Sequence, residues 1–284
     1  MTAPTARDVA VWHCGRFRLA LDRPLVMGIV NVTPDSFSDG GKFAGADEAV
    51  AYARRLVEEG ADLLDIGGES TRPGAAEVPV AEELRRVLPL VEGLAGEQVP
   101  LSVDTSKPDV MRAVLHAGAS VINDVLALSS PGALETVAAS DCGVVLMHMQ
   151  GTPRTMQSAP RYADVVTEVG RFLVERVDAA TRAGIVAGRI VVDPGFGFGK
   201  AREHNYAMLA RLDELAARGR PVLAGLSRKS MLSGAREGAP ADRLAASVAA
   251  AVLAVERGAR IVRVHDVGAT RDALEILAAT QAAA

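Results

Sequence analysis

The sequence predicts an α/β protein: a single (β/α)8 barrel, also called a TIM barrel, preceded by a β-hairpin. Short, nearly continuous apolar runs, typical of strands covered by helices on both faces, alternate with amphipathic helical patterns. Eight such runs occur, and the units between Asn31 and Arg263 average about 33 residues, close to the ~30 that a βαβ repeat needs. An open dinucleotide-binding sheet would want GxGxxG after its first strand, where this chain has NVTPDSFSDGG.

The expected elements follow one another in a regular order, because each apolar run ends in a polar or glycine-rich cluster and a helical pattern follows it. The expected strands are 25–30, 63–66, 101–103, 121–122, 144–147, 190–192, 222–224 and 261–264. The expected helices include 47–59, 81–95, 109–117, 162–183, 206–218, 242–257 and 269–282. Glycines suited to end a helix in the left-handed conformation follow five of them: Gly60, Gly118, Gly184, Gly219 and Gly258.

The N-terminal segment predicts a β-hairpin. Residues 11–21 (VWHCGRFRLAL) alternate around Cys14-Gly15-Arg16, which is typical of two strands joined by a tight turn. We expect this hairpin to cover the floor of the barrel. No linker-like stretch divides the chain, so we expect one domain over 1–284, with 1–24 as an N-terminal extension.

Composition narrows the classes of partner. The chain has 284 residues, 49% hydrophobic and 23% charged, which excludes a disordered scaffold, and its net charge of −4 disfavours nucleic acid. The longest apolar stretch, 244–255, is too short to cross a bilayer, so we expect no membrane partner. Cys14 and Cys142 are far apart and form no CxxC motif, so we expect neither a disulfide framework nor a zinc site, and a cytoplasmic location.

Nearly every expected strand ends in polar side chains. The carboxyl ends of parallel barrel strands meet at one rim, where such barrels carry their active sites. A single Asp or Ser after a strand is commonly only a helix N-cap, but polar groups at eight strand ends indicate a ligand site, because unpaired buried charges are costly. The polar strand-end residues include Asn31, Asp104, Asn123, His148, Asp193, Lys229, Arg263 and His265.

Eight segments at these strand ends together resemble a known family. In chain order they are MGIVNVTPDSFSDGG, DIGGESTRPGA, SVDTSKP, INDV, LMHMQGTPRTMQ, DPGFGFGK, GLSRKSML and RVHDVGAT. In order and in register, from about Val26 to Val267, they resemble the dihydropteroate synthases, folate-pathway enzymes that join a pterin to p-aminobenzoate. The one departure noted, Leu126 after the INDV segment, lies outside the residues assigned below.

The resemblance implies a transferase reaction in which p-aminobenzoate displaces pyrophosphate from 6-hydroxymethyl-7,8-dihydropterin pyrophosphate, giving 7,8-dihydropteroate. It implies Mg²⁺ at Asn31, and a pyrophosphate pocket of Asn31, Arg263 and His265. Carboxylates suit the adjacent N–H donors of a pterin, and an arginine can stack on its ring. The implied pterin contacts are Asp104, Asn123, Met147, Asp193, Lys229 and Arg263.

The resemblance places the p-aminobenzoate carboxylate at the N-terminus of the helix after the seventh strand, with Ser230 donating, because helix N-termini favour anions. The other implied p-aminobenzoate contacts are Thr71, Arg72, Pro73 and Phe198. The implied catalytic positions are Asn31, Asp35, Arg72, Lys229, Arg263 and His265, with Asp35 near the metal or the developing cation. The implied mechanism is dissociative and needs no covalent nucleophile, and sulfonamides are expected to compete with p-aminobenzoate.

Three alternatives share parts of this pattern. A methyltransferase barrel acting on methyltetrahydrofolate would share Asp104, Asn123 and Asp193 but would not need the TPDSFSDGG, STRPGA or SRKS segments. A non-catalytic pterin binder would have no use for pyrophosphate contacts, and the chain lacks the repeats of a scaffold protein. The resemblance also implies a homodimer, and the Ala-rich helices 242–257 and 269–282 are the candidates to pack between subunits.

Overall fold

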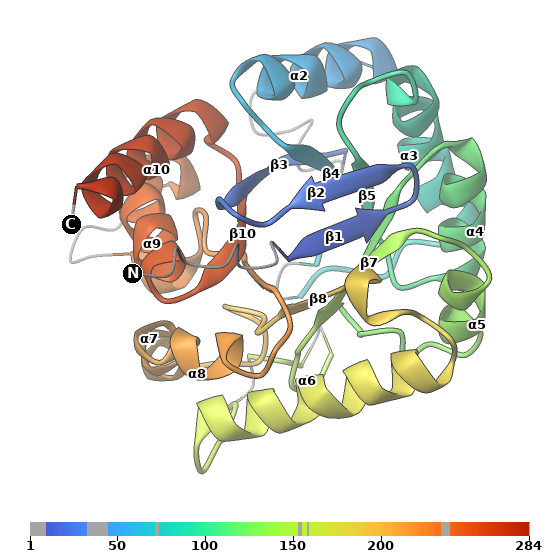
Figure 1. Ribbon diagram of the computed structural model, residues 1–284. Helices are drawn as coiled ribbons and strands as arrows, with labels where there is room; N and C mark the ends of the chain where they lie inside the picture. Colours follow the sequence, from blue (N-terminus) through green and yellow to red (C-terminus); the bar gives the residue numbers. More distant parts are fainter. Residues whose placement is uncertain are drawn as a thin grey trace, which may run out of the picture.

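The computed structural model describes residues 10–32, 45–71, 74–152, 155–157, 159–233 and 239–283. Parallel strands form a closed barrel in the order β10-β3-β4-β5-β6-β7-β8-β9, with helices around it (Figure 1). The strands are β3 (Leu25–Asn31), β4 (Leu63–Gly67), β5 (Leu101–Asp104), β6 (Val121–Asp124), β7 (Gly143–Met147), β8 (Ile190–Asp193), β9 (Val222–Ala224) and β10 (Ala259–Val264). The predicted barrel is confirmed, and each strand lies within two residues of its expected bounds.

The helices follow the strands as the sequence predicts, with three differences. The described helices are α2 (Ala46–Glu58), α3 (Val80–Leu94), α4 (Pro108–Ala117), α5 (Ala133–Ala138), α6 (Val165–Arg182), α7 (Arg202–Ala210), α8 (Leu212–Ala216), α9 (Leu244–Glu256) and α10 (Val267–Ala282). The expected helix 206–218 is instead two helices, because Arg211 leaves the helical region at φ −116° and ψ 29°. The expected helix 242–257 begins as a 3-10 turn, Pro240–Arg243, and the short α5 was not predicted.

The ends of the helices agree better with the sequence. All five glycines predicted to follow helices have positive φ, from 83° at Gly219 to 117° at Gly118. Backbone in this region is strained for other residues, so each glycine favours the stop that lets the chain return to the sheet. None of the helices in the described part of the chain is long and apolar enough to cross a membrane.

The N-terminal hairpin covers the amino ends of the barrel strands, as predicted. Strands β1 (Val11–Cys14) and β2 (Phe17–Ala20) pair antiparallel across the Gly15 turn, where φ is 58°. Trp12 is fully buried and its Nε1 donates to the Arg189 carbonyl at 2.9 Å. The Trp12 and Cys14 side chains pack with the lowest inward side chains of the barrel strands, so the hairpin closes the floor and leaves the opposite rim for a site.

Alternation along each strand separates the two layers of the core. In β4, Leu64 and Ile66 face outward and pack with residues of the surrounding helices, whereas Leu63 belongs to the inner floor cluster. Asp65 stands between the outward-facing pair, so it lies on the inner face with Leu63. A carboxylate inside a barrel needs hydrogen-bond donors or a partner of opposite charge. The partners of Asp65 therefore locate the candidate site.

Strand pairing sets the rim. Asn31 at the end of β3 pairs with Gly67, Gly67 pairs with Asp104, and Asp104 pairs with Asn123. A slip of one residue between any two of these strands would turn their side chains to the other face. The register therefore places the polar residues Asn31, Asp104 and Asn123 at one level, with Gly67 between the first two.

Candidate functional site

A buried polar network crosses the barrel at the rim, with Asp65 at its centre. Asp65 is fully buried, and its Oδ1 accepts from Ser102 Oγ at 2.5 Å. Its Oδ2 accepts from Asn123 Nδ2 at 3.1 Å and from Arg263 Nε at 2.5 Å. Four strands thus contribute to one network, and both oxygens of the central carboxylate are satisfied.

Asp65 is a site residue that sequence reasoning did not assign. The signal was present, because an acidic side chain in the middle of the apolar strand LLDIG must face a partner inside the fold. Which partner it faces depends on β10, 198 positions away in the chain. Only the closed barrel brings Arg263 and Asp65 together.

Arg263 links two carboxylates. Its Nη2 donates to Asp104 Oδ2 at 3.3 Å while its Nε binds Asp65. Burial lowers the pKa of Arg263, but the charges of Asp65 and Asp104 raise it more, so the guanidinium stays charged and held in place. Burial raises the pKa of the Asp104 carboxyl, which Arg263 opposes and the negative Asp65 reinforces.

Asp193 and Lys229 form the second charged part of the rim. Asp193 ends β8, and its Oδ1 accepts from the Gly195 amide at 2.7 Å. Burial raises the pKa of Asp193, and the charge of Lys229 opposes that shift. Burial also lowers the pKa of Lys229 to about 8. The Lys229 ammonium donates to the Phe196 carbonyl and stands 4.7 Å from the centre of the Phe198 ring.

A buried lysine braces the turn that carries Phe198. Lys200 is 2% exposed, and its Nζ donates to the carbonyls of Gly195 and Phe198, both at 2.9 Å. Nζ also lies 2.9 Å from His148 Nδ1. Burial lowers the pKa of Lys200 well below its usual range and that of His148 to about 3, so His148 is neutral at pH 7. The glycine-rich DPGFGFGK segment is thus fixed from within, a role that the sequence did not reveal.

His265 and Lys229 are positioned by the turn after β9. Arg228 has a positive φ of 58°, and its side chain forms two hydrogen bonds to Asp266, at 2.5 and 3.1 Å. Its amide donates to Ser247 Oγ at 2.9 Å, which further fixes this strained residue. His265 Nδ1 lies 3.0 Å from Ser227 Oγ, so the serine orients the imidazole ring.

Ser230 opens a short helical turn after β9. This turn is the three-residue 3-10 helix Ser230–Leu232, which ends where Ser233 returns to extended backbone at ψ 118°. The long helix of this unit, α9, begins further along the chain, at Leu244. Ser230 itself is exposed, and its predicted contact with p-aminobenzoate stays a prediction.

The remaining predicted positions divide into described and undescribed residues. Asn31 is half-buried at the end of β3, and a Cβ at Gly67 would lie 3.1 Å from its Oδ1, so the glycine leaves room for the amide. Met147 ends β7 and is 3% exposed, and Thr71 is half-buried beyond β4. The predicted positions that lie outside the described residues are Asp35, Arg72 and Pro73.

The donor set suits a weakly held magnesium ion. Among the described residues no group of three His, Cys, Asp or Glu side chains could hold a metal. Mg²⁺ commonly keeps several waters and takes one or two protein oxygens together with substrate phosphates. The amide oxygen of Asn31 is a hard ligand of this kind, so the residues present fit an ion that arrives with a pyrophosphate.

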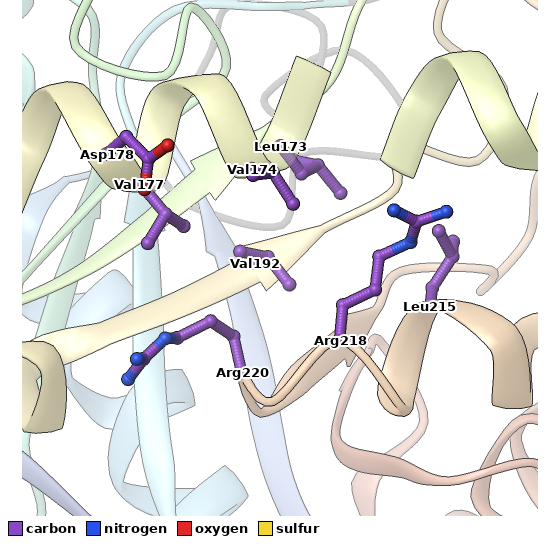
Figure 2. A pocket seen from close by; sticks show the side chains of 8 residues that line it. All are labelled: Leu173, Val174, Val177, Asp178, Val192, Leu215, Arg218 and Arg220. Carbon is purple, nitrogen blue, oxygen red and sulfur yellow. The ribbon is translucent and has the colours of Figure 1, made fainter. Parts of the chain in front are cut away.

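A separate pocket lies outside the barrel. It has a volume of about 170 Å³ and opens between α6 and the end of α8 (Figure 2). Figure 2 shows Val192 of β8 facing α6, with Arg218 and Arg220 on the turn that follows α8. None of the rim residues lines this pocket, so it does not belong to the candidate site.

Geometry defines the class of protein. Carboxylates, an amide and two cations from strands around a closed barrel meet at its carboxyl rim, which is the arrangement of an enzyme of the (β/α)8 class acting on a small polar molecule. The pterin-binding enzyme family matches residues 27–265. The chain belongs to this family.

Characterised relatives agree over nearly the whole chain. The dihydropteroate synthase of Escherichia coli K12 is 52% identical over 93% of this chain and 94% of its own. The structure of Xanthomonas albilineans dihydropteroate synthase with 4-aminobenzoic acid is 58% identical, with a TM-score of 0.90 over 96% of this chain and 99% of its own. That of the Burkholderia cenocepacia enzyme with 7,8-dihydropteroate is 55% identical, with a TM-score of 0.89 over 97% and 98%.

Proposed function

We propose that this chain is a dihydropteroate synthase, a transferase of folate biosynthesis that joins 6-hydroxymethyl-7,8-dihydropterin pyrophosphate to p-aminobenzoate. The observation that carries the proposal is the rim network of Asp65, Asn123, Arg263 and Asp104, with Lys229 and Asp193 beside it. Relatives at this level of identity bear the same name, and two of them bind 4-aminobenzoic acid or 7,8-dihydropteroate.

Buried carboxylates and an amide side chain recognise the pterin. Its aminopyrimidinone edge presents adjacent N–H donors, which a carboxylate accepts in pairs. Asp193 and Asp104 supply carboxylates, Asn123 supplies an amide, and Lys229 supplies a donor to the ring carbonyl and nitrogen. Met147 offers an apolar wall, and the fixed guanidinium of Arg263 offers a planar surface for the ring.

Pyrophosphate is held by cations and donors at the same rim. Asn31, Arg263 and His265 form its pocket, because β3 and β10 are neighbours in the barrel. Bound Mg²⁺, at Asn31, would neutralise charge on the departing pyrophosphate. The Ser227 hydroxyl fixes the imidazole of His265 for this contact.

The proposed contacts of the second substrate come from the segments after β4, β8 and β9. Thr71, Phe198 and Ser230 lie among the described residues, and Arg72 and Pro73 complete the proposed set. The Lys229 ammonium lies over the Phe198 ring, so the proposed pterin half-site, which includes Lys229, adjoins the proposed p-aminobenzoate half-site, which includes Phe198. Asp35 is proposed to stabilise the metal or the positive charge that develops on the pterin.

The reaction is a substitution at the exocyclic methylene of the pterin. The carbon–oxygen bond to pyrophosphate breaks first, the amine lone pair then forms the carbon–nitrogen bond, and the amine loses one proton. An arylamine is neutral at pH 7, so stabilising the leaving group and positioning the amine are sufficient. A cysteine nucleophile finds no support, because Cys14 and Cys142 are buried and burial raises the pKa of both thiols.

We further propose that the chain acts in the cytoplasm as one domain and as a homodimer. Support for a dimer comes from apolar side chains exposed on the last two helices: Leu244 is 42% exposed, Leu253 39% and Ile276 70%. Such side chains on α9 and α10 suit a contact with a second copy of the chain. Sedimentation of the purified protein tests this proposal, and a monomer at micromolar concentration would refute it.

A direct assay tests the activity. Purified protein is mixed with Mg²⁺, the pterin pyrophosphate and p-aminobenzoate, and both pyrophosphate and 7,8-dihydropteroate are measured. We expect equal amounts of the two products. Pterin binding without turnover would favour the non-catalytic binder, and methyl transfer from methyltetrahydrofolate would favour the methyltransferase.

A further inference from the structure

One side chain fastens both ends of the segment between β4 and α3, which contains Thr71. The carboxylate of Glu69 accepts from the Val78 amide at 3.0 Å through Oε1, and its Oε2 binds the ammonium of Lys107. Lys107 precedes α4 and lies three residues beyond Asp104. The strand end that carries Asp104 is thus connected through Lys107 to both ends of the Thr71 segment.

Lys107 has a second carboxylate partner from α3. Its Nζ lies 2.6 Å from Glu83 Oε2, and Glu83 is fully buried. Within the described residues, Oε1 of Glu83 has no hydrogen-bond partner. Arg86, one turn further along α3, donates to the Gly68 carbonyl at 2.8 Å and so holds the start of the same segment. The helix and the segment are therefore joined at several points.

This arrangement is a costly way to add stability. Two carboxylates share one ammonium, and a buried carboxylate oxygen without a donor keeps the cost of its desolvation. Apolar side chains of similar volume commonly stabilise a fold as well as a buried ion pair does. The charged groups instead specify a position. Glu69 can accept from the Val78 amide and bind the Lys107 ammonium in only one placement of the segment.

We propose that Glu69 and Lys107 are positioning residues for p-aminobenzoate, setting where the Thr71 segment stands relative to the pterin contacts of β5. The inference rests on the proposed function, since Thr71 is a contact only if that substrate binds there. Neither residue touches the reacting atoms. Both act through the segment that they fasten.

The first test is Glu69→Ala, which cuts both links and leaves Glu83 paired with Lys107. We expect KM for p-aminobenzoate to rise tenfold or more, with KM for the pterin pyrophosphate within twofold of the parent. Asp109→Ala is the matched control. It removes a carboxylate two residues from Lys107, and among the described residues this carboxylate forms its ion pair with the exposed Arg112. An unchanged KM for p-aminobenzoate in Glu69→Ala would overturn the proposal.

A second pair of variants separates position from stability. Lys107→Met leaves Glu83 without its cation and is expected to lower both thermal stability and p-aminobenzoate affinity. Adding Glu83→Met should restore stability while KM for p-aminobenzoate stays high. If KM returns to the parent value together with stability, the role is structural and the inference fails. Calorimetry measures binding of p-aminobenzoate to each variant, with Mg²⁺ and pyrophosphate present. This measurement tests the inference even if the parent protein gives no product. Lack of product would contradict the proposed function and would leave the inference about Glu69 and Lys107 to the binding data.

Discussion

The role of Asp65, the central carboxylate of the rim, can be tested by a substitution that removes its charge and keeps its shape. In Asp65→Asn, the amide oxygen can replace Oδ2 and still accept from Arg263 Nε and Asn123 Nδ2. The amide nitrogen then replaces Oδ1 and donates to Ser102 Oγ, whose hydroxyl can turn away. Every hydrogen bond is kept, so the variant isolates the charge that Arg263 faces.

The expected loss follows from what remains around Arg263. Breaking a buried ion pair by removing one partner costs about 3–5 kcal/mol. Asp104, whose Oδ2 lies 3.3 Å from Arg263 Nη2, still compensates part of the charge, so we expect about 2–3 kcal/mol for Asp65→Asn. For a chain of this size, that loss corresponds to a fall in Tm of roughly 3–5 °C.

Function should change along with stability. Without the negative Asp65, the pKa of Asp104 falls and its carboxylate becomes the main counter-ion of Arg263. Asp104 is then less available to the pterin, and we expect kcat/KM for the pterin pyrophosphate to fall by tenfold or more. Thermal unfolding and steady-state kinetics measure the two effects, and Ser102→Ala, which removes one neutral hydrogen bond, is the control. Asp65→Asn with unchanged Tm and kcat/KM would refute the reasoning.

Four other outcomes are expected. Lys229→Ala should lower kcat/KM at least 10²-fold while Tm stays within about 3 °C, because the lysine lies at the rim rather than in the apolar core; retained activity in the direct assay would contradict its pterin role. Since the pKa of Lys229 is lowered to about 8, its protonated fraction falls roughly tenfold from pH 7 to 9, and kcat/KM should fall with it. Over pH 8–10 the same group should make unfolding less favourable as pH rises, because the unfolded chain holds that proton longer, so activity and stability should move in opposite directions. Sulfonamides should inhibit competitively with p-aminobenzoate and not with the pterin pyrophosphate, and a pattern competitive with the pterin alone would contradict the proposed half-sites.

The barrel could be predicted because its signals are local. Apolar runs, helix-ending glycines and the alternating hairpin each depend on neighbours in the chain, and all appear where expected. The break at Arg211 and the short α5 lack such signals, since one residue outside the helical region and a six-residue helix leave little periodic pattern. The 3-10 turn Ser230–Leu232 is likewise too short to leave a periodic pattern.

The site could be predicted as a set of residues but not as a network. Motifs placed Asp104, Asn123 and Arg263 at strand ends. Strand register pairs Asp104 with Asn123, and the closed barrel brings Arg263 to Asp104. Asp65, which holds Asn123 and Arg263 in position, and Lys200, which braces the turn that carries Phe198, were not assigned, because their contacts with Arg263 and His148 form only in the folded barrel. A buried charge inside an apolar strand or a glycine-rich turn is the signal that points to such residues.

Burial shifts three charged groups of the rim toward their neutral forms. It raises the pKa of Asp104 and Asp193 and lowers that of Lys229. A pterin edge donates hydrogen bonds that favour the ionised acids, and a pyrophosphate favours the protonated lysine. Each substrate part therefore stabilises a charge that burial disfavours. Arg263, which Asp65 holds in place, stays charged with or without a ligand. The ligand therefore changes the ionisation of Asp104, Asp193 and Lys229 rather than that of Arg263.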